Sequence, residues 1–107
     1  MNRIEHLLTI LSEECVETAQ RASKAMRFGL DEIQPGQPLT NEERMWFEFA
    51  DLTAAVEMVM EERGSSLPES FWEHVAAKKA KVEKFLLYSA QCGTLTEPGT
   101  AAEGAEG

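Results

Sequence analysis

The chain has 107 residues, of which 43% are apolar, and a formal net charge of −9. This length fits one small domain. A domain of this size has a small core and is only marginally stable alone. An acidic chain without a basic stripe cannot neutralise a phosphate backbone, so we expect no nucleic-acid binding. No apolar run has the length of a membrane span, no signal peptide precedes the first helical pattern, and the two cysteines form no metal or redox motif. We therefore expect a cytoplasmic protein without membrane contact.

Two long helices are predicted in the first part of the chain. The first covers about residues 2–28, where apolar side chains recur at helical spacing, and it ends before Gly29. The second follows a connection rich in Pro and Gly. It begins at the capping-box sequence of residues 40–43 and ends before Gly64.

A third helix and an acidic tail complete the chain. The third helix is predicted to open with a second capping-box pattern at residues 66–69 and to run to about residue 90. Residues 93–107 are rich in Gly, Ala and Glu and have too little apolar content to order themselves. The sequence thus predicts a folded domain over residues 1–92 and a disordered tail over 93–107.

The second predicted helix is apolar on two flanks. One flank holds Met45, Phe49, Leu52, Val56 and Val59, and the other holds Phe47, Ala50, Ala54 and Met58. A helix that is apolar on both flanks must be covered on both, which three helices of one chain cannot easily do. We therefore expect an all-α fold, a helical bundle of three long helices per chain that is completed by homo-oligomerisation, most simply a symmetric homodimer.

Two pairs of carboxylates lie within these helical patterns. Glu14 and Glu17 form one pair, with Glu13 just before it, and Glu48 and Asp51 form the other. A spacing of three places both members of a pair on one helix face. A single pair of this kind usually lies on a solvated face. Two pairs, each among large apolar residues, favour a divalent cation between the helices, because four facing carboxylates otherwise repel each other.

Basic and amide side chains share faces with these acids. Lys24 lies seven residues after Glu17, while Asn41 and Arg44 precede Glu48 on one face of the second helix. Together with Arg27, they could hold phosphates bridged by the cation. Mg²⁺ suits such a site, since it takes hard oxygen ligands and leaves positions open for phosphate oxygens, and Mn²⁺ is the alternative.

The order of these residues resembles a known family signature. The run Glu13-Glu14-x-x-Glu17, followed after a spacer by Glu48-x-x-Asp51, is similar to the motif of the MazG-like all-α nucleoside triphosphate pyrophosphohydrolases. The similarity covers roughly residues 4–90 and includes Lys24, the run Arg27-Phe28-Gly29 and Asn41-x-x-Arg44.

The resemblance implies a function and a role for each matching residue. It implies chains that form dimers or dimers of dimers and hydrolyse NTPs or dNTPs between the α and β phosphates, giving a monophosphate and pyrophosphate. Glu13 would support the metal ligands or activate water. The metal ligands would be Glu14, Glu17, Glu48 and Asp51. The substrate would contact Lys24, Arg27, Asn41, Arg44, Lys78 and Lys81.

Two other hypotheses remain open. The chain could be a non-catalytic helical interaction or regulatory module on the same scaffold, which would be indifferent to Mg²⁺. It could also be a pyrophosphatase with another substrate, such as a phosphoribosyl nucleotide. The preferred base, and the choice between dimer and tetramer, do not follow from the sequence.

Overall fold

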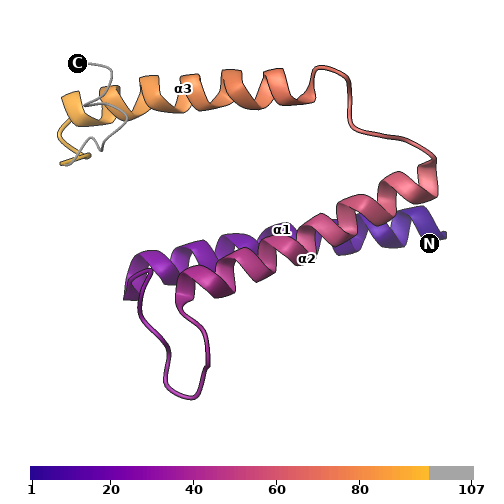
Figure 1. The fold of residues 1–107 in the computed structure, drawn as a ribbon, viewed down its shortest axis with the longest axis horizontal. Helices are drawn as coiled ribbons and strands as arrows, with labels where there is room; N and C mark the ends of the chain where they lie inside the picture. The colour runs from indigo at the N-terminus through magenta and orange to yellow at the C-terminus, as the bar shows by residue number, and fades with distance from the viewer. Residues whose placement is uncertain (97–107) are drawn as a thin grey trace. The chain divides into compact units, whose positions relative to one another are not determined.

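The computed structural model describes residues 1–96, and these residues form three helices and no strand. The helices are α1 (Arg3–Phe28), α2 (Asn41–Arg63) and α3 (Phe71–Gln91) (Figure 1). The chain divides into two units, one from Met1 to Ser66 that contains α1 and α2, and a second that starts at Leu67 and contains α3. The predicted all-α fold is confirmed for this part of the chain. Residues 97–107 of the predicted tail lie outside the described residues.

The ends of α1 and α2 follow from their capping residues. The Thr40 hydroxyl accepts a hydrogen bond from the Glu43 amide, while the Glu43 carboxylate accepts one from the Thr40 amide, which completes the predicted capping box. Gly29 ends α1 and Gly64 ends α2, with φ values of 100° and 63°. Residues other than glycine rarely adopt such positive φ values. Asn2 caps the start of α1 through its Oδ1.

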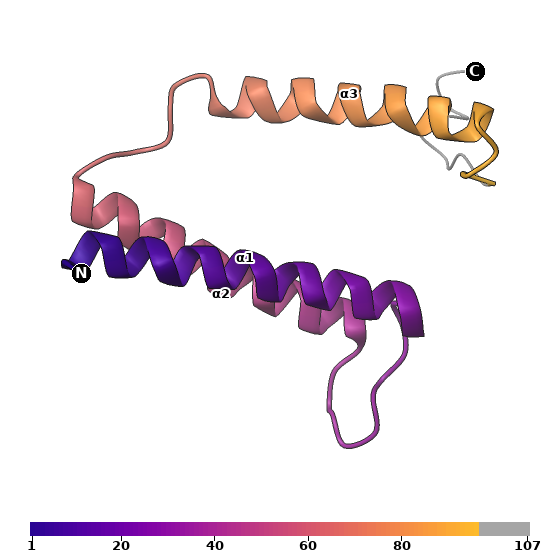
Figure 2. The same cartoon turned by 180° about the vertical axis from the view of Figure 1, so that it is seen from behind.

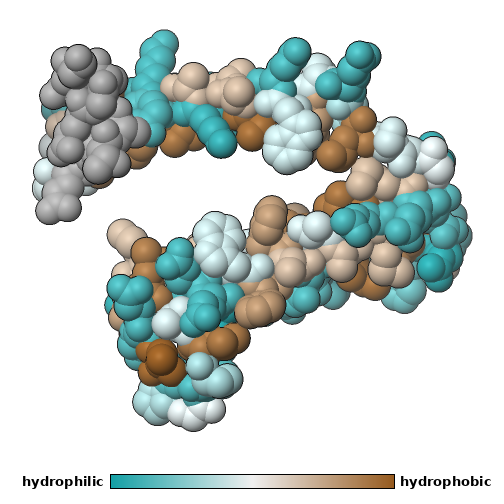
Figure 3. All heavy atoms as spheres, in the orientation of Figure 1, coloured by the Kyte–Doolittle hydropathy of each residue, from teal (hydrophilic) through white to brown (hydrophobic). Residues whose placement is uncertain are grey.

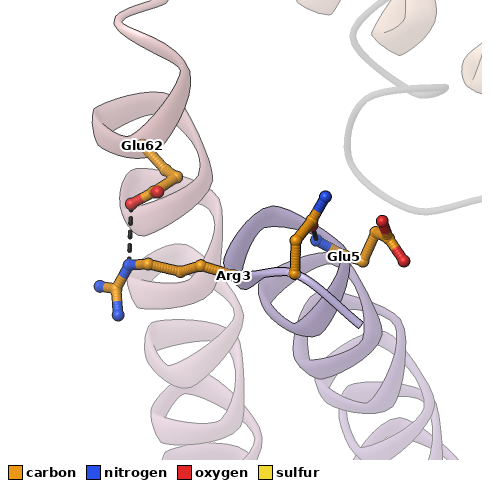
Figure 4. Close-up of polar contacts among 4 residues, drawn as sticks. Arg3, Glu5 and Glu62 are labelled. Carbon is orange, nitrogen blue, oxygen red and sulfur yellow. Dashed lines mark hydrogen bonds and ion pairs between the residues drawn. The ribbon is translucent and has the colours of Figure 1, made fainter.

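The two helices of the first unit pack side by side as an antiparallel hairpin (Figures 1 and 2). At its open end, the Nε of Arg3 at the start of α1 donates to Oε2 of Glu62 at the end of α2 over 2.8 Å, while Glu5 takes no part in this pair (Figure 4). This contact joins the start of α1 to the end of α2, so each step along α1 corresponds to a step backwards along α2.

The less exposed side chains of the hairpin recur at alternating spacings of three and four residues, the pattern of two helices packed along a seam. On α1 these are Ile4, Leu7, Leu11, Glu14, Thr18, Arg21 and Ala25, and on α2 they are Asn41, Met45, Glu48, Leu52, Ala55 and Val59. Only Leu7, Ala25 and Ala55 are buried apolar residues within residues 1–96. The hairpin therefore has one packed face and leaves its other faces to solvent.

The connection between α1 and α2 is held by the first turn of α2. The backbone amides of Asn41 and Glu42 donate to the carbonyls of Glu32 and Leu30, each over 3.0 Å. The side-chain amide of Asn41, only 3% exposed, donates to the carbonyl of Gly29 over 2.8 Å and to Oε1 of Glu32 over 2.9 Å. These bonds use the free amides of the helix start, so the loop is tied to α2 at several points.

The start of α3 differs from the prediction. The capping box expected at residues 66–69 is wrong, because α3 begins at Phe71 after Ser70, which makes no side-chain capping bond. Leu67 precedes Pro68, and a residue before proline is disfavoured in helical conformation, which disfavours a helix start at Leu67. Beyond α3, the amides of Thr94 and Leu95 donate to the carbonyl of Ser89, so the chain turns back after the helix.

Apolar side chains reach the surface in both units, as the brown spheres in Figure 3 show. On α2 the exposed large residues are Trp46, Phe47, Phe49 and Met58, and on α3 they are Trp72, Val82, Phe85, Leu87 and Tyr88. None of the three helices is both long enough and apolar enough to cross a membrane.

Candidate metal centre

The apolar pattern of the α1–α2 seam is interrupted at its middle. Glu14, Thr18 and Arg21 of α1 and Glu48 of α2 take seam positions, with Leu11 and Leu52 on one side and Ala25 and Met45 on the other. The Thr18 hydroxyl donates to the Glu14 carbonyl over 2.8 Å, so its polar atom is satisfied within α1. The carboxylates have no such local partner, which makes them the unusual feature of the seam.

Three carboxylates converge at this point. Glu14, Glu17 and Glu48 each offer one oxygen, and these oxygens lie within 4.8 Å of one another. Glu14 and Glu48 are half-buried, whereas Glu17 is exposed at the edge of the seam. The Oε2 atoms of Glu14 and Glu48 are buried and have no hydrogen-bond partner. Buried polar atoms nearly always have one, so these two oxygens lack a partner that a bound water or ion could supply.

The surroundings of the two half-buried acids favour their protonated forms. Burial, followed by the charges of Glu17, Asp51 and Glu48, raises the pKa of Glu14 above its usual value. Burial and the charges of Glu17 and Asp51 also raise the pKa of Glu48, and the nearby charge of Arg21 partly offsets this increase. Glu14 or Glu48, once protonated, can donate a hydrogen bond to Glu17. This bond further raises the pKa of the acid that donates it.

No basic side chain pairs closely with the carboxylates. Over residues 1–96 the Arg3–Glu62 pair is the one salt bridge, and it lies at the other end of the hairpin. Arg21 acts on Glu48 through its charge without forming an ion pair at contact distance. The negative charge of the cluster is therefore not neutralised by a direct partner within this part of the chain.

The donor set and the spacing fit a divalent cation. Carboxylate oxygens are the ligands that Mg²⁺, Mn²⁺ and Ca²⁺ prefer. Opposite ligands of Mg²⁺ lie about 4.2 Å apart and those of Ca²⁺ about 5 Å apart, as follows from their bond lengths. The 4.8 Å limit on the three oxygens is comparable with these spans. Glu14, Glu17 and Glu48 are thus candidate ligands for such a cation.

Two other predicted acids lie close to this triad. Asp51 is exposed and outside the group of converging oxygens, but its charge raises the pKa of both Glu14 and Glu48, which places it nearby. Glu13 and Glu17 line a shallow pocket on the outer face of α1. Direct coordination by Asp51 and a supporting or water-activating role for Glu13 stay predictions.

The predicted substrate contacts of the hairpin gather near its loop. Lys24 and Arg27 line a pocket at the end of α1. The Nη1 of Arg44 donates to Oε1 of Gln34 in the loop over 2.9 Å. Asn41 is buried, and both hydrogen bonds of its side-chain amide go to the loop. The structure therefore gives Asn41 a structural task, and its substrate contact stays a prediction.

The two predicted substrate contacts of the third helix are Lys78 and Lys81. Both are exposed on α3, in the second unit. Their contact with phosphates also stays a prediction.

Sequence reasoning missed several residues of this region. Arg21 lies seven residues after Glu14, a spacing that places both on the same face of α1 and could have indicated it. Glu32 and Gln34 belong to the loop, where no periodic pattern exists, so their position beside Lys24 and Arg27 could not have been found from spacing.

Comparisons with known proteins give no independent identification. No protein-family model, curated protein or solved structure matches this chain. The function is therefore inferred from the residues of the hairpin and from the motif that they form.

Proposed function

We propose that the hairpin binds Mg²⁺ and that the protein is a nucleoside triphosphate pyrophosphohydrolase. One observation carries the metal site: two buried carboxylate oxygens without partners, on Glu14 and Glu48, face a third carboxylate on Glu17 in the middle of an apolar seam. An apolar pair at these positions would pack without electrostatic cost, and a bound cation would offset the cost that the carboxylates bring. Mn²⁺ is an alternative occupant of the same oxygens.

The choice of reaction rests on the resemblance of Glu13-Glu14-x-x-Glu17 and Glu48-x-x-Asp51 to the MazG-like motif. In this proposal an NTP or dNTP is cleaved between its α and β phosphates to a monophosphate and pyrophosphate. When bound, the cation supplies positive charge to the phosphate oxygens and lowers the pKa of a coordinated water. Glu13 is a carboxylate near the triad that could accept a proton from the attacking water.

The basic residues at the loop end would hold the substrate. Lys24 lies seven residues from Glu17, about 10 Å along α1. Arg44 lies four residues from Glu48, about 6 Å along α2. Both distances are within the length of a nucleotide whose phosphates lie at the triad. Charge on these side chains would offset the phosphates without entering the chemical step.

A screen for pyrophosphate release tests the proposal. The full chain would be incubated with Mg²⁺ and each of the eight common NTPs and dNTPs, and the nucleotide product would be identified by chromatography. We expect a monophosphate and pyrophosphate. Glu48→Gln should abolish most turnover, whereas Glu57→Gln, which removes the same charge from an exposed position of α2, should not. A diphosphate with orthophosphate as the first products would contradict the proposed scissile bond.

The second candidate function is a non-catalytic interaction module, which the exposed aromatic side chains of α2 and α3 favour. Such a module would bind its partner equally well with and without Mg²⁺. Mg²⁺ binding by calorimetry separates the two, since the enzyme requires it. A protein that neither binds Mg²⁺ nor hydrolyses any nucleotide would favour the module.

We also propose that the chain forms a homodimer or a dimer of dimers. Three buried apolar side chains are a small core for two long helices, and Trp46, Phe47 and Phe49 of α2 are each about half exposed or more. Exposed apolar surface of this kind usually marks an interface. Light scattering at micromolar concentration should give a multiple of the chain mass of 11.9 kDa. A stable, well-folded monomer would contradict this proposal.

A further inference from the structure

A pocket of about 320 Å³ lies where α1 meets the loop that leads to α2. It is lined by Lys24, Arg27, Phe28, Glu32 and Gln34. Its volume lies in the range of small-molecule sites. Two of the lining residues, Glu32 and Gln34, have no part in the predicted motif, and their side chains bring an acceptor and an amide to a region that is otherwise basic.

The loop side of this pocket is preorganised by α2. The Asn41 amide donates to Oε1 of Glu32 over 2.9 Å, and Arg44 donates to Oε1 of Gln34 over 2.9 Å. Each bond fixes one oxygen of the loop residue. The other carboxylate oxygen of Glu32 and the amide group of Gln34 are left to a ligand. A ligand that uses them would not have to order the loop first, which strengthens binding.

The opposite side of the pocket offers planar surfaces. The guanidinium of Arg27 lies over the ring of Phe28, 4.8 Å from its centroid. Nucleobases stack on aromatic rings and on arginine planes alike. A phosphate cannot stack on such a surface, and the charge of Glu32 offsets part of the attraction that Lys24 and Arg27 would exert on it. The pocket is thus better suited to a base than to the phosphates.

We propose that this pocket binds the base of the nucleotide, with Arg27 and Phe28 as the stacking surface, Glu32 as the acceptor for a base N–H group and Gln34 as the donor to a base oxygen or nitrogen. This inference rests on the proposed function, because it takes the substrate to be a nucleotide. It assigns a direction to that substrate: the phosphates lie at the triad, Lys24 lies between, and the base lies at the loop.

The experiment compares nucleotides with a ligand that lacks the base. The full chain with saturating Mg²⁺ would be titrated calorimetrically with the four common nucleoside monophosphates and with ribose 5-phosphate. We expect at least one nucleotide to bind about 10-fold or more tightly than ribose 5-phosphate, as one stacked and hydrogen-bonded base would give. Binding of Mg²⁺ alone would be measured separately on the same protein.

Glu32→Gln is the informative variant. Its amide oxygen can still accept from Asn41, so the loop bond is kept while the charge is lost. We expect the preferred nucleotide to bind about 10- to 100-fold more weakly, as for loss of a hydrogen bond to a charged group, with unchanged affinity for ribose 5-phosphate and for Mg²⁺. Asp31→Asn removes the same charge from a neighbouring exposed loop residue outside the pocket and should change none of these affinities.

The outcomes separate this inference from the proposed function. If Mg²⁺ and ribose 5-phosphate bind but no nucleotide binds more tightly, the metal site stands and the base pocket is wrong. If Glu32→Gln weakens all ligands equally, Glu32 does not contact a base, and the assignment is also wrong. If neither Mg²⁺ nor any phosphate binds, the proposed function and the base pocket are both refuted.

Discussion

Replacing Asn41 by alanine should destabilise the hairpin, although this residue belongs to the motif that predicts substrate binding. Asn41 is 3% exposed, and its amide donates to the Gly29 carbonyl over 2.8 Å and to Glu32 over 2.9 Å. Each lost bond costs about 1 kcal/mol, so the free energy of unfolding should fall by about 2 kcal/mol. For a domain of this size that corresponds to a melting temperature lower by about 8–16 °C.

Urea unfolding followed by circular dichroism at one fixed protein concentration measures the effect. Arg3→Ala is the matched control, because it removes a 2.8 Å ion pair with Glu62 between side chains that are 66% and 35% exposed. Such a surface pair contributes at most about 1 kcal/mol. If Asn41→Ala were no more destabilising than Arg3→Ala, the loop would not depend on Asn41, and the residue would be free to contact substrate.

Three further predictions concern the triad and the exposed surface. Thermal melts of the metal-free protein should show stability rising as pH falls from neutral towards the ordinary glutamate pKa of 4.5. Glu14 and Glu48 have raised pKa values in the folded chain, so the folded state binds more protons in this range. The two acids do not destabilise the fold below their pKa in the unfolded chain, and they do so fully above their pKa in the folded chain. Saturating Mg²⁺ should remove this pH dependence. Glu48→Gln should keep or raise the stability of the metal-free protein and should abolish the stabilisation by Mg²⁺. For the unchanged chain that stabilisation is about 1.4 kcal/mol at ten times the dissociation constant. The double change Phe47→Ser and Phe49→Ser, at two exposed positions of α2, should lower the mass measured by light scattering without loss of helix; an unchanged mass would place the interface elsewhere.

The helix boundaries could be predicted wherever a local signal decides them. Thr40 and Glu43 form the expected capping box, and Gly29 and Gly64 end their helices with positive φ. The same reasoning failed at residues 66–69, where the composition suits a capping box but Pro68 restricts the residue before it. A capping pattern predicts a helix start only if the backbone of its own residues can become helical.

The candidate site could be predicted in part. Spacing places Glu14 with Glu17 and Glu48 with Asp51 on their helix faces. It does not decide which member of each pair lies in the seam, because this depends on the register of α1 against α2. The structure assigns Glu14 and Glu48 to the seam and leaves Glu17 and Asp51 at its edge. The loop pocket was beyond prediction, since hydrogen bonds from Asn41 and Arg44 shape it rather than any periodic pattern.

Two features lower the stability of the isolated hairpin, and a different proposed partner would compensate for each. Inside the seam, the unpaired oxygens of Glu14 and Glu48 weaken the packing of two helices whose only buried apolar residues within residues 1–96 are Leu7, Ala25 and Ala55. Apolar residues in their place would strengthen it, and the proposed cation would give the carboxylates a role that packing does not. Outside the seam, exposed aromatic side chains of α2 require apolar cover, which a cation cannot provide. A metal that binds the carboxylates should therefore raise stability at constant mass. A second chain that covers α2 should make stability depend on protein concentration. Measuring melting temperature against both concentrations separates the two contributions, and a melting temperature insensitive to both would contradict the metal site and the oligomer together.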